Sequence, residues 1–196
     1  MEPRHDHWIA AKHILRYLFG TIHHCLKYVG NKIQLLGYTK FDCRGSETYG
    51  KSTTGGFFCL GFSMISWMSK KQDIVSLSSV EANYVATGEV CREFVWLRKL
   101  LSDLFEGQLS PAIIHCDNQS CIRLTKDSVF HARTKHINNK YHYIRSLVQD
   151  GVVKLHYISR DEQVVNILTK ALPNKKLEYL RIKLGLVDIS SLVKRE

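Results

Sequence analysis

Asp117 is the acidic residue best placed to do chemistry in this chain of 196 residues. It follows the apolar run Ala112–Cys116, which is typical of a short buried strand, so it stands at the carboxyl end of that strand. Open α/β sheets place their functional sites at this edge, although an acid there can also simply cap the next helix. A metal-dependent nuclease would need several more carboxylates at the same place, because they hold two Mg²⁺ ions about 4 Å apart.

Contact with phosphate groups is the second chemistry that the residue types indicate. Residues 118–149 contain one acid, Asp127, and six cations that suit phosphate contacts: Arg123, Lys126, Arg133, Lys135, Lys140 and Arg145. The whole chain has a formal net charge of +10 and a pI near 9.4, with 15 basic and 8 acidic residues in 111–196. Such a balance favours a polyanion, above all nucleic acid, as a partner, while solubility alone is the simpler interpretation.

Histidine, cysteine and tryptophan do not add a further site. His131, His136 and His142 lie in the basic stretch without a cysteine partner, so they indicate a solvated helix face rather than zinc. No two of the six cysteines have CxxC spacing, and we expect reduced, mostly buried thiols. The tryptophans could stack on bases, but we expect them to pack in the core; they are Trp8, Trp67 and Trp96.

The spacing of apolar residues predicts the elements that position these groups. Helical spacing begins after Pro3 and ends at Gly20, and residues 33–68 indicate a three-stranded antiparallel meander. A long helix is expected from the capping pair Ser78–Ser79 to Gly107. The other expected elements are, in order, two strands, two helices, a strand and two helices: Cys25–Val29, Ala112–Cys116, Asn118–Thr125, Thr134–Val148, Val152–Ile158, Glu162–Leu172 and Asn174–Leu184. A meander followed by alternating strands and helices predicts an α/β fold with a mixed sheet and helices packed on it.

Length and composition exclude several classes of protein. A chain of 196 residues predicts one domain, or one domain with an appendage, and 44% hydrophobic residues suffice for a core without disulfides. No run approaches the roughly 18 apolar residues of a membrane-spanning helix, and the polar start of the chain contains no signal peptide. We therefore expect an intracellular protein, cytoplasmic or nuclear, without a membrane partner.

Nine short motifs, in the same order along the chain, carry a resemblance to a known family. They are His7–Lys12, Leu15–Thr21, Lys51–Gly56, Ile65–Trp67 with Ser69–Gln72, Leu77–Ala82, His115–Ser120, Arg133–Ile137, Tyr141–Arg145 and Leu168–Pro173. Together they resemble the ribonuclease H domain at the C-terminal end of the Pol polyprotein of copia-type LTR retrotransposons. Each motif alone is weak, whereas their order over almost the whole chain is specific.

The resemblance implies a fold, a division of the chain and an activity. The fold would be a ribonuclease H-like mixed five-stranded sheet with helices, preceded by a helix left from the reverse transcriptase part. The domains would be residues 1–32 as the end of the reverse transcriptase region, 33–172 as the ribonuclease H-like domain and 173–196 as a helical tail. The implied activity is Mg²⁺-dependent hydrolysis of the RNA strand of an RNA–DNA hybrid.

Three of the four metal-binding acids that the resemblance implies are replaced in this sequence. Lys40 stands where the first strand carries an Asp, and Asn83 stands where the long helix carries its second Glu. Asp117 is retained, and Asn166 replaces the fourth acid. The four positions therefore sum to a charge of zero instead of −4, which leaves Asp117 as a weak metal ligand on its own. We expect Lys40 to pair with Asp117 at the place of the metal.

Neighbouring acids do not restore this set. Asp42 shares a strand face with Lys40 but is displaced by roughly 7 Å, so it is the only acid that could partly replace the lost ones. Glu81 lies about 200° around the helix from Asn83 and points away. Asp161, five residues before Asn166, is also off the face.

Three functions from different classes remain open at this point. The first is a binding module: a domain that binds RNA–DNA hybrid or another nucleic acid, with hydrolysis impaired or lost. The second is an active Mg²⁺-dependent hybrid ribonuclease that uses displaced acids. The third is a non-catalytic structural or pseudogene remnant, in which the exposed apolar face of the first helix contacts a reverse transcriptase region or a second copy.

Overall fold

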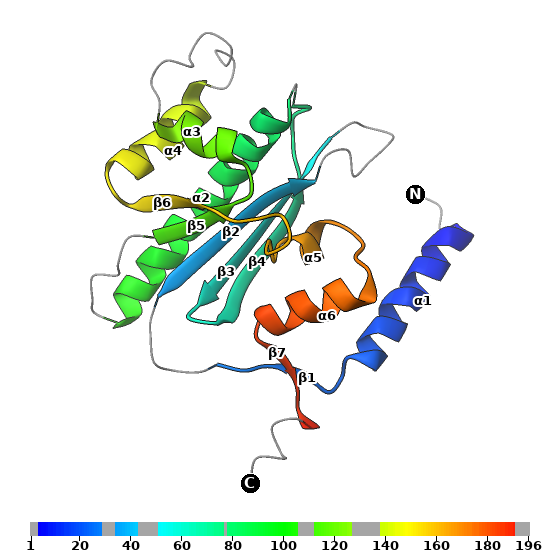
Figure 1. The fold of residues 1–196 in the computed structure, drawn as a ribbon. Helices are drawn as coiled ribbons and strands as arrows, with labels where there is room; N and C mark the ends of the chain where they lie inside the picture. Colours follow the sequence, from blue (N-terminus) through cyan, green and yellow to red (C-terminus); the bar gives the residue numbers. More distant parts are fainter. Residues whose placement is uncertain are drawn as a thin grey trace.

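The centre of the molecule is a five-stranded mixed sheet with the strand order β4-β3-β2-β5-β6 (Figure 1). The computed structural model describes residues 4–28, 34–42, 51–76, 78–105, 112–126 and 138–190, and of 138–142 the backbone alone. The strands are β2 (Leu35–Asp42), β3 (Thr53–Leu60), β4 (Ser63–Lys71), β5 (Ala112–Cys116) and β6 (Val153–Tyr157). The meander and the mixed sheet expected from the sequence are confirmed.

Two kinds of pairing meet at β2 and decide which residues share the carboxyl edge of the sheet. β2 runs antiparallel to β3, with Lys40 opposite Gly55, and parallel to β5, with Thr39 opposite Cys116. Parallel strands end at the same edge. The residues that follow Thr39 and Cys116, which are Lys40 and Asp117, therefore lie side by side there.

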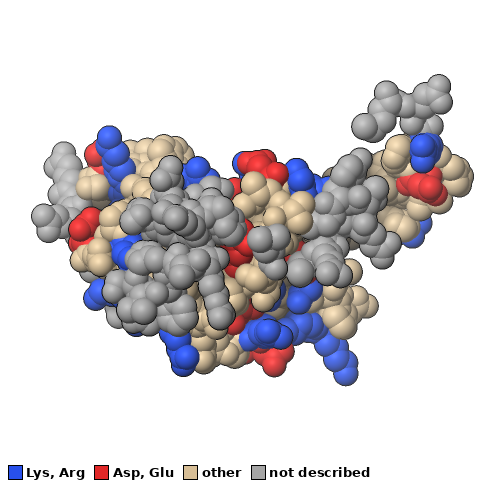
Figure 2. Space-filling view, turned by 90° about the horizontal axis from the view of Figure 1, so that it is seen from above, with Lys and Arg blue, Asp and Glu red and all other residues tan. Residues whose placement is uncertain are grey.

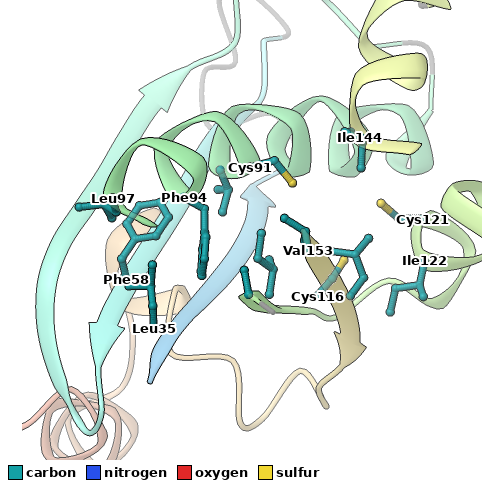
Figure 3. Packing of buried hydrophobic residues seen from close by; sticks show 14 of the residues in the cluster. Leu35, Phe58, Cys91, Phe94, Leu97, Cys116, Cys121, Ile122, Ile144 and Val153 are labelled. Atoms are coloured by element: carbon teal, nitrogen blue, oxygen red, sulfur yellow. The ribbon is translucent and has the colours of Figure 1, made fainter. Parts of the chain in front are cut away.

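One face of the sheet is covered by α2 (Ser79–Phe105), α3 (Gln119–Lys126) and α4 (Asn138–Gln149) (Figure 1). The Ser78 hydroxyl accepts a hydrogen bond from the Glu81 N–H at 3.1 Å, which confirms the expected cap of the long helix. Phe94 of α2 is fully buried and its ring centroid lies 6.2 Å from that of Phe58 in β3 (Figure 3). This close approach depends on Gly37 of β2, because a Cβ there would lie 2.8 Å from the Phe94 ring.

The other face carries α5 (Asn166–Thr169) and α6 (Asn174–Lys183). Leu180 of α6 is fully buried and belongs to a second apolar cluster with Phe57, Val164 and Val165. The helix expected over Glu162–Leu172 is wrong in its extent, since only four of its residues are helical. The preceding residues form turns that hold Val164 and Val165 against the sheet.

The chain outside the sheet begins with α1 (His5–Gly20), which has no buried residue and stands apart from the sheet in Figure 1. After it, β1 (His24–Leu26) pairs antiparallel with β7 (Leu186–Asp188), a strand that we did not expect from the sequence. The division at residues 32 and 172 stays a prediction. Within the described ranges, no helix is both long and apolar enough to cross a membrane.

Two further expectations concern the burial of the cysteines and of the tryptophans. The described cysteines are free thiols and most are buried, as expected. The placement of the tryptophans in the core is wrong, because Trp8, Trp67 and Trp96 are each more than half exposed, on three different elements.

Candidate functional site

A buried ion pair occupies the carboxyl edge of β2 and β5. The Lys40 ammonium donates a hydrogen bond to Asp117 Oδ2 at 2.6 Å, and both side chains are less than a tenth exposed. The pairing that we expected between these two residues is therefore present. Each charge of the pair compensates the other, and removal of one partner would leave an uncompensated buried charge.

Asn83 reaches the same end of the sheet from α2. Its Nδ2 donates to the Ser79 carbonyl at 3.1 Å, while its buried Oδ1 has no hydrogen-bond partner among the described residues. The Asn83 carbonyl accepts a bond from the Thr87 hydroxyl, which in turn lies 3.6 Å from Cys121 Sγ in α3. A series of buried polar contacts thus links this part of α2 to the first turn of α3.

Two of the cysteines at this end influence each other. A hydrogen bond from Cys121 lowers the pKa of the Cys116 thiol, and the same bond together with burial raises the pKa of Cys121. Burial raises the pKa of the neighbouring Cys91 to about 12. The network therefore keeps Cys91 and Cys121 as neutral thiols, next to the strand end that carries Asp117.

Asn166 reaches the site from the other face, at the start of α5. Its Nδ2 donates to the Arg160 carbonyl at 2.9 Å, and its buried Oδ1 has no partner in the part of the chain that the structure describes. Gly55 makes this position possible, because a Cβ there would lie 2.5 Å from side-chain atoms of Val165 and Thr169. Only a glycine in β3 lets the α5 segment approach the sheet so closely.

Two further buried polar groups belong to this edge. Gln163 donates through Nε2 to the Thr39 carbonyl at 3.1 Å, whereas within the described ranges Gln163 Oε1 and the Thr39 hydroxyl have no partner. The sequence patterns did not point to either residue. A Gln and a Thr in apolar surroundings carry no motif, and only the long-range contact between them marks the place.

A divalent cation does not fit these residues. Across the part of the chain that the structure describes, no group of three or more His, Cys, Asp or Glu side chains is arranged to hold a metal ion. The single carboxylate, Asp117, is bound by an ammonium group. Mg²⁺ prefers several charged oxygens, and the amides of Asn83 and Asn166 supply none.

An aromatic stack lies on β2, β5 and β6. The rings of Tyr38 and His115 stack with centroids 4.8 Å apart, and His156 meets His115 edge-on at 6.0 Å. Burial, and next the nearby His156, lower the pKa of His115. Burial raises the pKa of Tyr38 to about 12, so both groups are neutral at pH 7.

Comparison with known proteins decides the family. No family model matches the chain. The retrovirus-related Pol polyprotein from transposon TNT 1-94 of Nicotiana tabacum is 42% identical over 184 residues, which cover 94% of this chain and 14% of the relative. The Pol polyprotein from transposon RE2 of Arabidopsis thaliana is 37% identical over 188 residues, which cover 95% of this chain and 13% of the relative. The chain is therefore a homologue of one segment of the Pol polyproteins of copia-like retrotransposons. It spans about one seventh of the length of these relatives.

The fold of this Pol segment is that of ribonuclease H. A ribonuclease H1 isolated from compost by a metagenomic approach superposes with a TM-score of 0.54 at 14% identity, over 75% of this chain and 97% of that chain. At this identity the likeness shows the fold alone. The expected ribonuclease H-like sheet with an N-terminal helix is confirmed.

Among the described residues, the nearby acids do not form with Asp117 a group of three or more that could hold a metal ion. Asp42 is half-buried at the end of β2, opposite Thr53. Glu81 is buried in the first turn of α2. Asp161 is exposed and its carboxylate pairs with Lys176 at 3.4 Å.

The cations expected to contact nucleic acid are placed unevenly. Arg123 and Lys126 lie exposed on α3, and Arg145 is half-buried on α4. Arg133, Lys135 and the Lys140 side chain lie outside the described residues. Figure 2 shows Lys and Arg spread over this view of the Pol segment with Asp and Glu among them, so the visible charges do not form a face of one sign.

Proposed function

We propose that this retrotransposon ribonuclease H-like domain binds RNA–DNA hybrid and that its hydrolysis of the RNA strand is impaired or lost. The observation that carries the proposal is the 2.6 Å ion pair between Lys40 and Asp117. The one acid retained among the four matched positions is committed to a protein cation. Strong binding of Mg²⁺ is therefore not part of the proposed function.

Charge supports the same conclusion. Lys40, Asp117 and the two buried amides of Asn83 and Asn166 sum to zero at the matched positions. Two Mg²⁺ ions would bring four positive charges into a region that is already neutral. Such a region has little attraction for a hard divalent cation.

Hybrid binding does not require the lost acids. Phosphate contacts from Arg and Lys supply affinity without reading sequence, and a chain with a formal net charge of +10 has these residues in excess. Arg123 and Lys126 are the exposed described cations nearest in sequence to Asp117. Binding should therefore follow the shape of the duplex and weaken steeply with salt.

The test measures cleavage and binding side by side. The chain and the variant Lys40→Asp/Asn83→Glu/Asn166→Asp are incubated with Mg²⁺ and a fluorescently labelled RNA–DNA hybrid, and binding is followed by anisotropy at several salt concentrations. We expect the parent to bind without measurable cleavage. The triple variant should cleave at least about a thousandfold faster than the parent, since it restores the electrostatic part of metal catalysis.

The matched control is the triple variant with Asp117→Asn added, which should again show no measurable cleavage of the hybrid. Robust Mg²⁺-dependent cleavage by the parent chain would overturn the loss of hydrolysis. Hybrid binding that is absent, or that does not respond to salt, would contradict the binding part of the proposal.

A further inference from the structure

A surface pocket lies between α3 and the edge strand β6, beside the site described above. Its volume is about 460 Å³, within the range of pockets that hold small ligands. It is lined by Gln119, Ile122, Arg123, Lys126, Leu155, His156 and Tyr157. Its position follows from the fold: Tyr157 is the β6 partner of Cys116 in β5, and α3 begins two residues after Asp117.

One wall of the pocket is cationic. Gln119, Arg123 and Lys126 are spaced by four and three residues, so they share one face of α3. Neither Arg123 nor Lys126 forms an ion pair with any residue that the structure describes, and the lining contains no acid. Two exposed cations with a neutral amide beside them suit a phosphate group, which accepts several hydrogen bonds.

The remaining lining is apolar and aromatic. The lining residues Ile122 and Leu155 are buried, whereas Tyr157 is about half exposed. A tyrosine ring beside apolar side chains offers a nucleobase a surface for stacking, and stacking on an aromatic side chain tolerates any base. The Tyr157 ring and the two cations line the same pocket, so a ligand there can carry a planar ring and a phosphate together.

We infer that this pocket binds one nucleotide unit, with its phosphate at Arg123 and Lys126 and its base against Tyr157. The unit could be a free nucleotide or a nucleotide of a single strand, since both present the same chemistry. The inference goes beyond the proposed function, because it assigns a site for a single unpaired nucleotide, although Arg123 and Lys126 are also among the cations proposed to contact the hybrid. It does not depend on whether the hybrid binds.

Three probes test the pocket: adenosine 5′-monophosphate, inorganic phosphate and a single-stranded oligothymidylate. Each is titrated into the isotope-labelled chain, and the amide resonances are followed by NMR. We expect saturable shifts confined to residues 119–126 and 153–158, with the nucleotide binding more tightly than phosphate. Binding by the monophosphate assigns a free nucleotide, and binding by the oligonucleotide alone assigns a nucleotide within a strand.

Variants separate the two parts of the pocket. Arg123→Gln/Lys126→Gln should weaken all the probes that bind by at least about fivefold, because it removes charge-assisted hydrogen bonds. Tyr157→Ala should weaken the nucleotide probes by about fivefold and leave phosphate binding unchanged. The control Lys99→Gln/Lys154→Gln removes the same charge from exposed positions outside the pocket and should change little.

The inference is overturned in two ways. The first is the absence of any saturable shift in these segments of the parent chain with either nucleotide probe up to about 10 mM, a concentration at which even weak specific sites fill. The second is a control variant that weakens binding as much as Arg123→Gln/Lys126→Gln, which would show attraction by net charge alone. Binding of the labelled RNA–DNA hybrid to the same variants, measured by fluorescence anisotropy, tests the proposed function separately.

Discussion

The sheet has an apolar middle and a polar end, and α2 runs along both. In the middle, Phe94 and Leu97 pack on Phe58 and Leu35, and none of these side chains needs a polar partner. At the polar end, Lys40, Asn83 and Asn166 are buried to a similar degree. The two regions are therefore buried to a similar degree, but only the side chains of the polar end need hydrogen-bond partners.

The polar end meets those requirements only in part. Lys40 and Asp117 satisfy each other, whereas Thr39 Oγ1, Asn83 Oδ1, Gln163 Oε1 and Asn166 Oδ1 are buried without partners among the described residues. Buried polar atoms are nearly always hydrogen-bonded in native proteins. The middle thus contributes apolar burial to the stability of the fold, whereas the polar end leaves part of its hydrogen-bonding capacity unused among the described residues.

Truncation in the apolar middle should have the largest effect. Phe94→Ala removes a fully buried ring from beside Phe58 and Gly37, and should lower the free energy of unfolding by about 4 kcal/mol. Urea denaturation followed by circular dichroism measures this. Phe62→Ala is the control, because that ring is more than four-fifths exposed and its loss should matter little. If the two changes lowered the free energy of unfolding equally, the expected difference between the core position and the surface position would be contradicted.

Breaking the ion pair should come next. Asp117→Ala leaves the Lys40 ammonium buried without a counter-charge and should cost about 3 kcal/mol. Lys40→Met/Asp117→Ala removes both charges and should recover most of the loss, within about 1 kcal/mol of the parent. Denaturation midpoints of the three proteins decide this. A double variant no more stable than the single one would show that the two charges do not interact.

Replacing an unpartnered amide should have a smaller effect of opposite sign. Asn83→Leu keeps the size of the side chain and removes the unpaired Oδ1, so the free energy of unfolding should rise by about 0.5 kcal/mol. The reciprocal change in the apolar middle, Leu97→Asn, should be clearly destabilising. If both changes destabilise alike, the hydrogen bond from Asn83 Nδ2 to the Ser79 carbonyl outweighs the cost of the unpaired Oδ1.

The smallest expected effect is a pH dependence at His115. Its pKa in the folded chain lies below the ordinary 6.5, chiefly because of burial, so the unfolded chain binds the proton more readily. Stability should be fully present above pH 6.5 and fall as the pH drops below it. His115→Gln should flatten this fall in urea midpoints measured between about pH 7.5 and 5.5. The exposed His23→Gln is the control, and an unchanged slope in His115→Gln would contradict the assignment.

Local patterns predicted the elements that depend on local physics. The cap at Ser78, the helical spacing of α2 and the apolar run of β5 each identify an element without knowledge of its partners. The pairing of Lys40 with Asp117 could also be predicted from the sequence, because the resemblance to the family aligned both positions with metal-binding acids.

Long-range contacts account for what the sequence did not predict. β7 has three residues and exists only because β1 pairs with it. The segment 162–165 has helical spacing but forms turns, because Val164 and Val165 pack on the sheet and Gln163 bonds to the Thr39 carbonyl. The pocket beside Tyr157 combines α3 with an edge strand that follows it by about thirty residues. A local sequence pattern therefore cannot predict the pocket, because its two sides come from segments that are far apart in the sequence.

The pairing of β1 with β7 has a consequence for the order of folding. His24 lies opposite Asp188, so this ladder closes a loop of about 160 residues, whereas β2, β3 and β4 are neighbours in sequence. The entropy of closing so large a loop is recovered only after the intervening chain has collapsed. The three-residue ladder should therefore form last, and its amides should exchange with solvent before those of the central sheet.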